Sequence, residues 1–276
     1  MNIQSIINPV PDYTAIKVKQ NAAWSAGDYA KVGVTLQITG EELAESMNLD
    51  ADSTVLDVAA GNGNATLAFA RRFYDVTSTD YVETLLSASA RRAEAEGLNI
   101  QYQVADAENL PFETERFDAV VSTFGVMFTP NQKQAASELQ RVVRTGGKIG
   151  LANWTPDSFI GQLFKTIGKH VTPPPGVKSP ALWGNRDWID ETFGTSGEVI
   201  SFRLKNFTFR YRSAEHFLDY FRTFYGPMQK AFAALDEDGS EALKSDVLAL
   251  AGKFDISMNS TLRVPSEYAE IVIEKR

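Results

Sequence analysis

The 276-residue chain contains no cysteine, which excludes disulfide bonds, thiolate nucleophiles and zinc sites with cysteine ligands. Histidine is scarce as well, because the chain holds just two, His170 and His216. A histidine-rich metal site is therefore not expected, and the sequence predicts no bound metal ion.

Long apolar runs are also missing. No stretch of about 18 or more consecutive apolar residues occurs, which is the length that a membrane-spanning helix needs. The first residues, MNIQSIINPVPDY, lack the positively charged segment and the apolar run of a secretory signal. These observations predict a cytoplasmic protein that does not insert into a membrane.

Clusters of positive charge are absent too. Lysine and arginine number 27 against 35 aspartates and glutamates, which gives a net charge of −8. Nucleic acid binding needs clustered positive charge opposite the phosphates, so we expect a small-molecule partner and no nucleic acid. Hydrophobic residues make up 43% of the chain, enough for the core of one large α/β domain with an inserted cap.

The stretch Val55–Ala65, VLDVAAGNGNA, organises the rest of the chain. A strand of buried character contains Asp57, and a turn of small residues with Gly61 and Gly63 follows it. Residues 66–73 then have the pattern of a helix. A strand, a glycine turn and a helix in this order place backbone N–H groups and a helix N-terminus against a ligand.

Strands and helices alternate regularly after this unit. Regular alternation predicts βαβ units with right-handed crossovers, and hence a doubly wound, Rossmann-like α/β fold. A proline-rich break at residues 173–176 and an aromatic-rich helix over residues 214–235 follow the regular part. The predicted strands cover residues 55–58, 75–79, 100–105, 117–123, 148–154, 198–211 and 268–273.

The turn does not fit a dinucleotide well. A nicotinamide fold needs a third glycine so that the helix can pack on the strand, and Thr66 stands in its place. A nicotinamide-dependent oxidoreductase therefore remains only an alternative. Asp57, Asp80 and Asp106 follow three successive strands, so they meet at one crevice, where they suit a cation and repel a pyrophosphate. This spacing favours adenosine joined to an amino acid.

Five separated motifs resemble the class I S-adenosylmethionine (SAM)-dependent methyltransferases, and most closely the ubiquinone and menaquinone biosynthesis group. They are VLDVAAGNGN, TSTDY, VADAENLPF, FDAVVSTFGVMF and RTGGKI, within Val55–Trp154. The resemblance implies a seven-stranded, mostly parallel sheet whose last strand runs antiparallel. It also implies SAM as the cofactor and methyl transfer as the reaction.

The resemblance gives these motifs roles toward the cofactor. The first loop contacts it, Asp80 holds the ribose, Tyr81 lies beside the adenine, and the residues after the third strand read the adenine edge. The end of the fourth strand touches the methionine part. In chain order, the expected contacts are Ala59, Gly61, Asn62, Gly63, Asp80, Tyr81, Asp106, Ala107, Thr123 and Phe124, to which the strand acid Asp57 is added.

The chain departs from this group in three places. Ala59 stands where the family has its first glycine, and the loop after the fourth strand is apolar where the quinone enzymes have a charged one. Beyond Trp154 no motif is shared, so the identity of the substrate does not carry over. The resemblance supports the cofactor and the type of reaction.

We expect three parts: an N-terminal helical lid over residues 1–50, a SAM-binding core over 51–154, and a cap with aromatic helices and closing strands over 155–276. The helical pattern of Tyr13–Tyr29 has two interpretations. Either it forms a lid whose Trp24 and Tyr29 close over the ligand, or it is an amphipathic helix that packs on the domain.

The chemistry needs positioning more than it needs acid or base. Methyl transfer from a sulfonium is an in-line displacement, and a general base is required only when the nucleophile must lose a proton. His170 is a weak candidate for such a base, and capping of a helix C-terminus is the favoured explanation for it. We therefore expect a methyltransferase for a small, mostly apolar or aromatic molecule, with a non-catalytic SAM-binding protein as the alternative.

Overall fold

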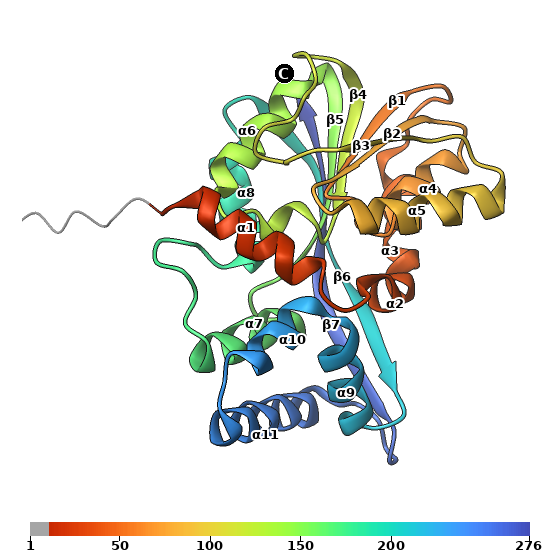
Figure 1. Cartoon of the computed structure of the whole chain (residues 1–276). Helices are drawn as coiled ribbons and strands as arrows, with labels where there is room; N and C mark the ends of the chain where they lie inside the picture. The colour runs from red at the N-terminus through yellow and green to blue at the C-terminus, as the bar shows by residue number, and fades with distance from the viewer. Residues whose placement is uncertain (1–10) are drawn as a thin grey trace, which may run out of the picture.

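The computed structural model describes residues 11–276, which fold around one seven-stranded sheet (Figure 1). The strand order is β3-β2-β1-β4-β5-β7-β6, and only β7 runs antiparallel to its neighbours. The predicted sheet is thereby confirmed. The strands are β1 (Thr54–Val58), β2 (Asp75–Asp80), β3 (Gln101–Val104), β4 (Phe117–Thr123), β5 (Val143–Trp154), β6 (Gly197–Tyr211) and β7 (Leu262–Lys275).

Helices cover both faces of this sheet. In Figure 1, α4 and α5 lie on one side of the parallel strands, and α6 and α8 lie on the other. None of the helices within residues 11–276 is long and apolar enough to cross a membrane. The α-helices are α1 (Tyr13–Trp24), α2 (Tyr29–Gly33), α3 (Gln37–Met47), α4 (Asn64–Ala70), α5 (Glu83–Glu96), α6 (Gln132–Val142), α7 (Phe159–His170), α8 (Arg186–Phe193), α9 (Ala214–Phe224), α10 (Gly226–Ala233) and α11 (Glu237–Phe254).

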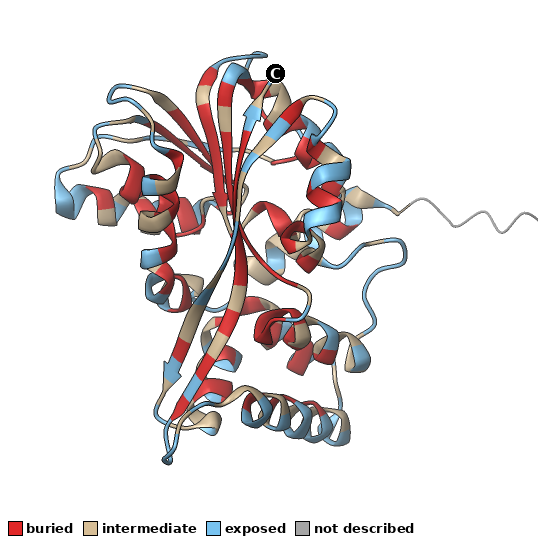
Figure 2. Ribbon diagram, turned by 180° about the vertical axis from the view of Figure 1, so that it is seen from behind, coloured by how far each residue is buried: buried red, intermediate tan, exposed pale blue. Residues whose placement is uncertain are grey.

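The central strands are buried on both faces, as the red colour of the sheet in Figure 2 shows. Two apolar clusters flank them, and the smaller one packs Leu43 and Met47 of α3 against Val55 and Val121. Although residues 1–50 were expected to form a lid, α3 belongs to this cluster. Only α1 and α2 lie near the ends of the strands, and residues 1–10 lie outside the described residues.

Two segments with a helical pattern are each divided in the structure. Gly27, with φ +70°, lies in the break between α1 and α2. The predicted helix over residues 214–235 was wrong as a single element. Pro227 has no N–H to continue the helix, and Tyr225 is extended, so α9 ends there and α10 begins.

The strands β6 and β7, at 15 and 14 residues, are the longest of the sheet and pair along their whole length. Their far halves extend below the parallel sheet in Figure 1, where α7, α9, α10 and α11 gather around them. The segments that follow β5 and β6 therefore build one helical cap on an extension of the central sheet.

A buried polar cluster ties the first helices to this extension. Glu270 of β7 has a side chain that is 1% exposed, and its carboxylate accepts hydrogen bonds from Lys205 Nζ at 2.7 Å and Ser46 Oγ at 2.6 Å. Lys205 also reaches Glu42, to which the Tyr268 hydroxyl donates at 2.7 Å. The cluster thus joins α3 to both long strands.

Replacing Lys205 by methionine should lower the free energy of unfolding by about 2 to 3 kcal/mol, because it leaves the Glu270 carboxylate buried without its cation. Urea denaturation measures this loss. The double variant Lys205→Met/Glu270→Gln should regain most of the stability, and a Lys205→Met protein as stable as the wild type would show that the pair does not hold the extension.

Candidate functional site: a two-chamber pocket

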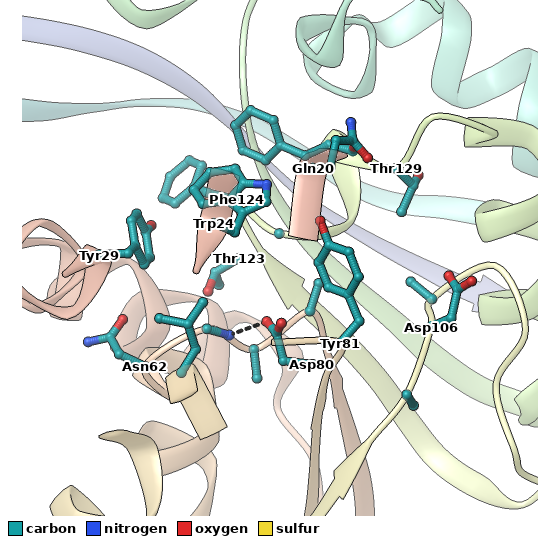
Figure 3. Close-up of a pocket in the computed structure, with 18 of the residues that line it drawn as sticks. Gln20, Trp24, Tyr29, Asn62, Asp80, Tyr81, Asp106, Thr123, Phe124 and Thr129 are labelled. Carbon is teal, nitrogen blue, oxygen red and sulfur yellow. Dashed lines mark hydrogen bonds between the residues drawn. The ribbon is translucent and has the colours of Figure 1, made fainter. Parts of the chain in front are cut away.

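A cavity of about 850 Å³, a figure that counts space open to solvent, lies beyond the carboxyl ends of the parallel strands (Figure 3). Its walls come from the loops after β1, β2, β3 and β4, with α1 and α2 on the open side. Open α/β sheets bind their ligands at this edge. Of the residues that the sequence proposed, those that line the cavity are Trp24, Tyr29, Ala59, Gly61, Asn62, Asp80, Tyr81, Asp106, Ala107, Thr123 and Phe124.

The loop after β1 takes a left-handed backbone at three places, with φ +53° at Ala59, +57° at Gly61 and +83° at Gly63. Ala59 adopts this conformation although it has a side chain, which is rare and strained. The loop also touches the loop after β4, because a Cβ on Gly125 would overlap the carbonyl oxygen of Ala59. Close packing therefore fixes the shape of this corner.

Asp80 links the loop after β1 to the end of β2. Its Oδ2 accepts the Gly61 N–H at 2.9 Å, drawn as a dashed line in Figure 3, and its Oδ1 accepts the Val82 N–H at 2.8 Å. Burial raises the pKa of Asp80 to about 6, although these hydrogen bonds oppose the shift. Each oxygen keeps capacity for a further hydrogen bond from a ligand in the cavity.

Asp57 and Gly63, both expected at the site, do not line the cavity. Asp57 lies behind the loop, where its Oδ2 accepts the Thr66 hydroxyl at 2.6 Å, and Thr66 also contacts Ser78 at 2.9 Å. Its Oδ1 has no partner among residues 11–276. Burial is the main cause that raises the pKa of Asp57 to about 7. Gly63 directly precedes the first residue of α4. Asp57 and Gly63 therefore support the shape of the loop after β1 and do not face the cavity.

Lys17 of α1 is a cavity residue that the sequence analysis missed. Its Nζ lies 2.6 Å from Asp106 Oδ2 and 3.1 Å from Glu108 Oε2. Asp106 Oδ1 in turn accepts the Glu108 N–H at 2.9 Å. A lysine on an amphipathic helix does not by itself indicate a binding site. The fold brings Lys17 next to Asp106 and Glu108, which lie far from it in the sequence.

Two further polar side chains attach α1 to the site. Gln20 Nε2 donates to the Phe128 carbonyl at 3.0 Å, and Asn21 Nδ2 donates to the Tyr81 carbonyl at 2.8 Å. Together with Lys17, these contacts connect α1 to the loops after β2, β3 and β4. Trp24, the last residue of α1, lies among the cavity residues in Figure 3.

A second, smaller cavity, here called the aromatic chamber, adjoins the first. Five residues line both cavities and stand between them, and this boundary is here called the neck: Trp24, Tyr29, Leu36, Phe124 and Phe128. Phe124 stacks on Trp154 with ring centroids 4.1 Å apart. The remaining residues of the chamber are Val32, Trp154, Ile160, Leu163, Phe164, Phe209, Phe221 and Tyr225.

His170, the weak candidate for a general base, lies at neither cavity. It ends α7, and its Nε2 lies 2.8 Å from Asp246 Oδ2 of α11. Its place at a helix C-terminus matches the structural explanation given above. Within residues 11–276 no group of three or more histidine, aspartate or glutamate side chains is arranged to hold a metal ion.

Comparison with known proteins places this site in a family. Residues 55–147 match the model of a methyltransferase domain. A protein of Mycobacterium tuberculosis is 36% identical over 234 residues, covering 84% of this chain and 85% of its own. The demethylmenaquinone methyltransferase of Deinococcus radiodurans is 31% identical over 142 residues, covering 50% of this chain and 59% of its own.

Solved structures share the fold at low identity. The YcgJ protein of Bacillus subtilis superposes with a TM-score of 0.62 at 17% identity, covering 86% of this chain and 98% of its own. A putative methyltransferase of Bacillus halodurans gives 0.59 at 21%, covering 84% and 96%. The chain therefore contains a methyltransferase domain in residues 55–147, and the resemblance of its motifs to the class I SAM-dependent methyltransferases is confirmed.

The buried carboxyl of Asp57 makes stability depend on pH. Its pKa is higher in the folded protein than the ordinary 3.8, so the folded state binds more protons between about pH 4 and pH 7, and stability falls as the pH rises through this range. Relative to Asp57→Asn, the ligand-free wild type should lose roughly 3 to 4 kcal/mol across it. Urea denaturation at several pH values measures the difference, and a difference independent of pH would contradict it.

Proposed function

We propose that the protein is a SAM-dependent methyltransferase that transfers a methyl group to a small, mostly apolar or aromatic molecule by in-line displacement. The observation that carries this proposal is the buried Asp80 carboxylate, held by two backbone N–H groups with one lone pair free on each oxygen. Two such lone pairs at the end of β2 suit the two hydroxyls of a ribose.

The other polar groups of the cavity fit the remainder of the cofactor. Asp106 lies at the end of β3, in reach of an adenine amino group. Asn62 lines the cavity as part of the loop after β1, which would contact the rest of the cofactor. The geranyl diphosphate C-methyltransferase of Streptomyces coelicolor, which shares the fold with a TM-score of 0.52, was solved with S-adenosylhomocysteine.

When bound, the cofactor supplies an electrophilic methyl group on a sulfonium. The protein's own work is to hold the two reactants in line and to exclude water. The neck residues Trp24, Phe124 and Phe128 surround the passage between the two cavities, where the transfer would take place. A second chamber that opens on the cofactor cavity favours an enzyme over a non-catalytic SAM-binding protein.

Asp80→Asn tests the proposal most simply. The amide cannot offer two charged acceptors to the ribose, so the affinity for S-adenosylhomocysteine should fall about a hundredfold. Isothermal titration calorimetry measures the change. The matched control is Asp75→Asn at the exposed start of the same strand, which should bind as the wild type does. Equal affinities in all three proteins would disprove the ribose role of Asp80.

We also propose that α1 and α2 form a lid on the cofactor cavity, above a core that extends to Trp154. This proposal is supported by the three polar attachments of α1 to the loops after β2, β3 and β4. The lid also contacts the cap, because the Asp28 N–H donates to the Phe224 carbonyl at 3.3 Å. A ligand that fills the cavity cannot leave until these attachments break.

Lys17→Met should therefore speed the dissociation of S-adenosylhomocysteine about tenfold, because it removes the ion pairs that attach the lid to Asp106 and Glu108. The effect is limited because the charges of Lys17 and Asp106 are partly exposed to water. Stopped-flow fluorescence of Trp24 and the other tryptophans follows the release. Lys19→Met, an exposed lysine on the same helix, is the control and should leave the rate unchanged. Release from Lys17→Met at the wild-type rate would contradict the lid.

A further inference from the structure

The aromatic chamber contains no group that carries a charge at neutral pH. Nine of its 13 lining residues are aromatic and the other four are aliphatic. Tyr29 and Tyr225 are the only titratable ones among them. Burial raises the pKa of Tyr29 to about 12 and that of Tyr225 further, so both hydroxyls stay protonated. No lining side chain can remove a proton from an acceptor or neutralise an anion.

Three ionisable groups on elements around the chamber, Asp80, Glu42 and His170, are absent from its lining. Asp80 acts on Tyr29 from the cofactor side of the neck, where the ribose would take its hydrogen bonds. On the other side, Glu42 is bound by Tyr268 and Lys205. His170 is bound to Asp246. An acceptor whose reacting atom must be deprotonated by the enzyme therefore finds no base in the chamber.

The rings at the neck give the chamber a preference for one sign of charge. Trp24 lies edge-on to Phe128 at 5.0 Å and to Tyr29 and Tyr225 at 5.5 Å. Aromatic faces attract cations and repel anions. Tyr29 and Tyr225 both line the chamber, and the hydroxyl of each can accept a hydrogen bond from an N–H group.

We infer that the methyl acceptor is an apolar amine that enters the aromatic chamber as the free base. This inference rests on the proposed function and names the substrate class of the same site. The attraction of the rings for an ammonium is worth about 2 kcal/mol, which is less than the cost of burying that charge without an acid beside it, so the apolar walls select the amine with a free lone pair. A carboxylate or a phosphate would find no cation in the lining to pair with. A thiol would find no base to remove its proton.

The proposed step balances without a co-reactant. The nitrogen lone pair forms the new N–C bond while the C–S bond breaks, and the electron pair of that bond stays on sulfur. The positive charge moves from sulfur to nitrogen across the ring-lined neck, so the aromatic faces stabilise it on both sides. The proton released to water is the one that the amine loses on entering the chamber, and the product leaves as the methylated ammonium.

The first test measures binding without turnover. We would titrate 2-phenylethylamine into protein saturated with S-adenosylhomocysteine at pH 7.5, in two buffers of different ionisation enthalpy. Because the amine is charged in water and neutral in the chamber, binding should release close to one proton per amine bound. Binding without proton release would overturn the inference, as would stronger binding of 3-phenylpropanoate. If the amine did not bind at all, the inference would also be overturned. The proposed function would still stand in that case, because the protein would have bound S-adenosylhomocysteine.

The second test compares reacting atoms on the same body. With methyl-labelled SAM, 2-phenylethylamine should be methylated at least about tenfold faster than 2-phenylethanethiol and 2-phenylethanol at pH 7.5. Its rate should rise with pH as the free amine becomes abundant. Preferred methylation of the thiol or the alcohol would contradict the assignment.

A variant separates the ring faces from simple apolar burial. Phe164 lines the chamber but not the cofactor cavity, and Phe164→Leu keeps the site apolar while it removes one π face. Methylation of the amine should fall about tenfold, with unchanged affinity for S-adenosylhomocysteine. Phe73→Leu, at a ring that is 80% exposed, is the control and should change neither quantity. Equal amine methylation by Phe164→Leu and wild type would show that the ring faces do not act on the charge.

Discussion

The hydrogen bond from the Gly61 N–H to the carboxylate of Asp80 is the contact on which the site depends. It joins the strained loop after β1 to the end of β2, and it keeps a negative charge buried where a ligand can reach it. Replacement of the carboxylate would release the loop and remove the acceptor together. Fold and function therefore share one residue at this corner.

The buried charges are costly for the ligand-free protein. Asp80 and Asp57 lie close enough that the charge of Asp80 raises the pKa of Asp57, and burial raises both. A ligand with hydroxyl donors and a positive charge would reduce this cost. It would give the buried carboxylates the hydrogen bonds and the opposite charge that they lack when they are shielded from water. The same acids that destabilise the ligand-free protein thus favour a cationic cofactor.

The lid connects the two chambers. Its helix α1 reaches the cofactor loops through Lys17, Gln20 and Asn21, and it ends in Trp24 at the neck. Tyr29 of α2 lines both cavities as well. In the proposed lid, a movement that admits the cofactor would also rearrange the wall of the aromatic chamber, because Trp24 and Tyr29 line both cavities.

The regular part of the fold and most of the crevice were predictable from sequence, because alternating strands and helices leave strand-end acids at one edge. Asp80 and Asp106 were found in this way. Lys17 was not, since its contact with Asp106 spans 89 residues and no local pattern announces it. Asp57 was placed on the right strand, but the pleat turns its side chain toward Thr66, away from the cavity. The break at Tyr225 was hidden by the aromatic run around Pro227.

A crystal structure of the protein with S-adenosylhomocysteine bound tests the central claim most directly. The account predicts that both ribose hydroxyls donate to the carboxylate of Asp80, and that the sulfur faces the neck between the two cavities. A nucleoside bound away from Asp80, or a sulfur atom directed away from the aromatic chamber, would contradict it.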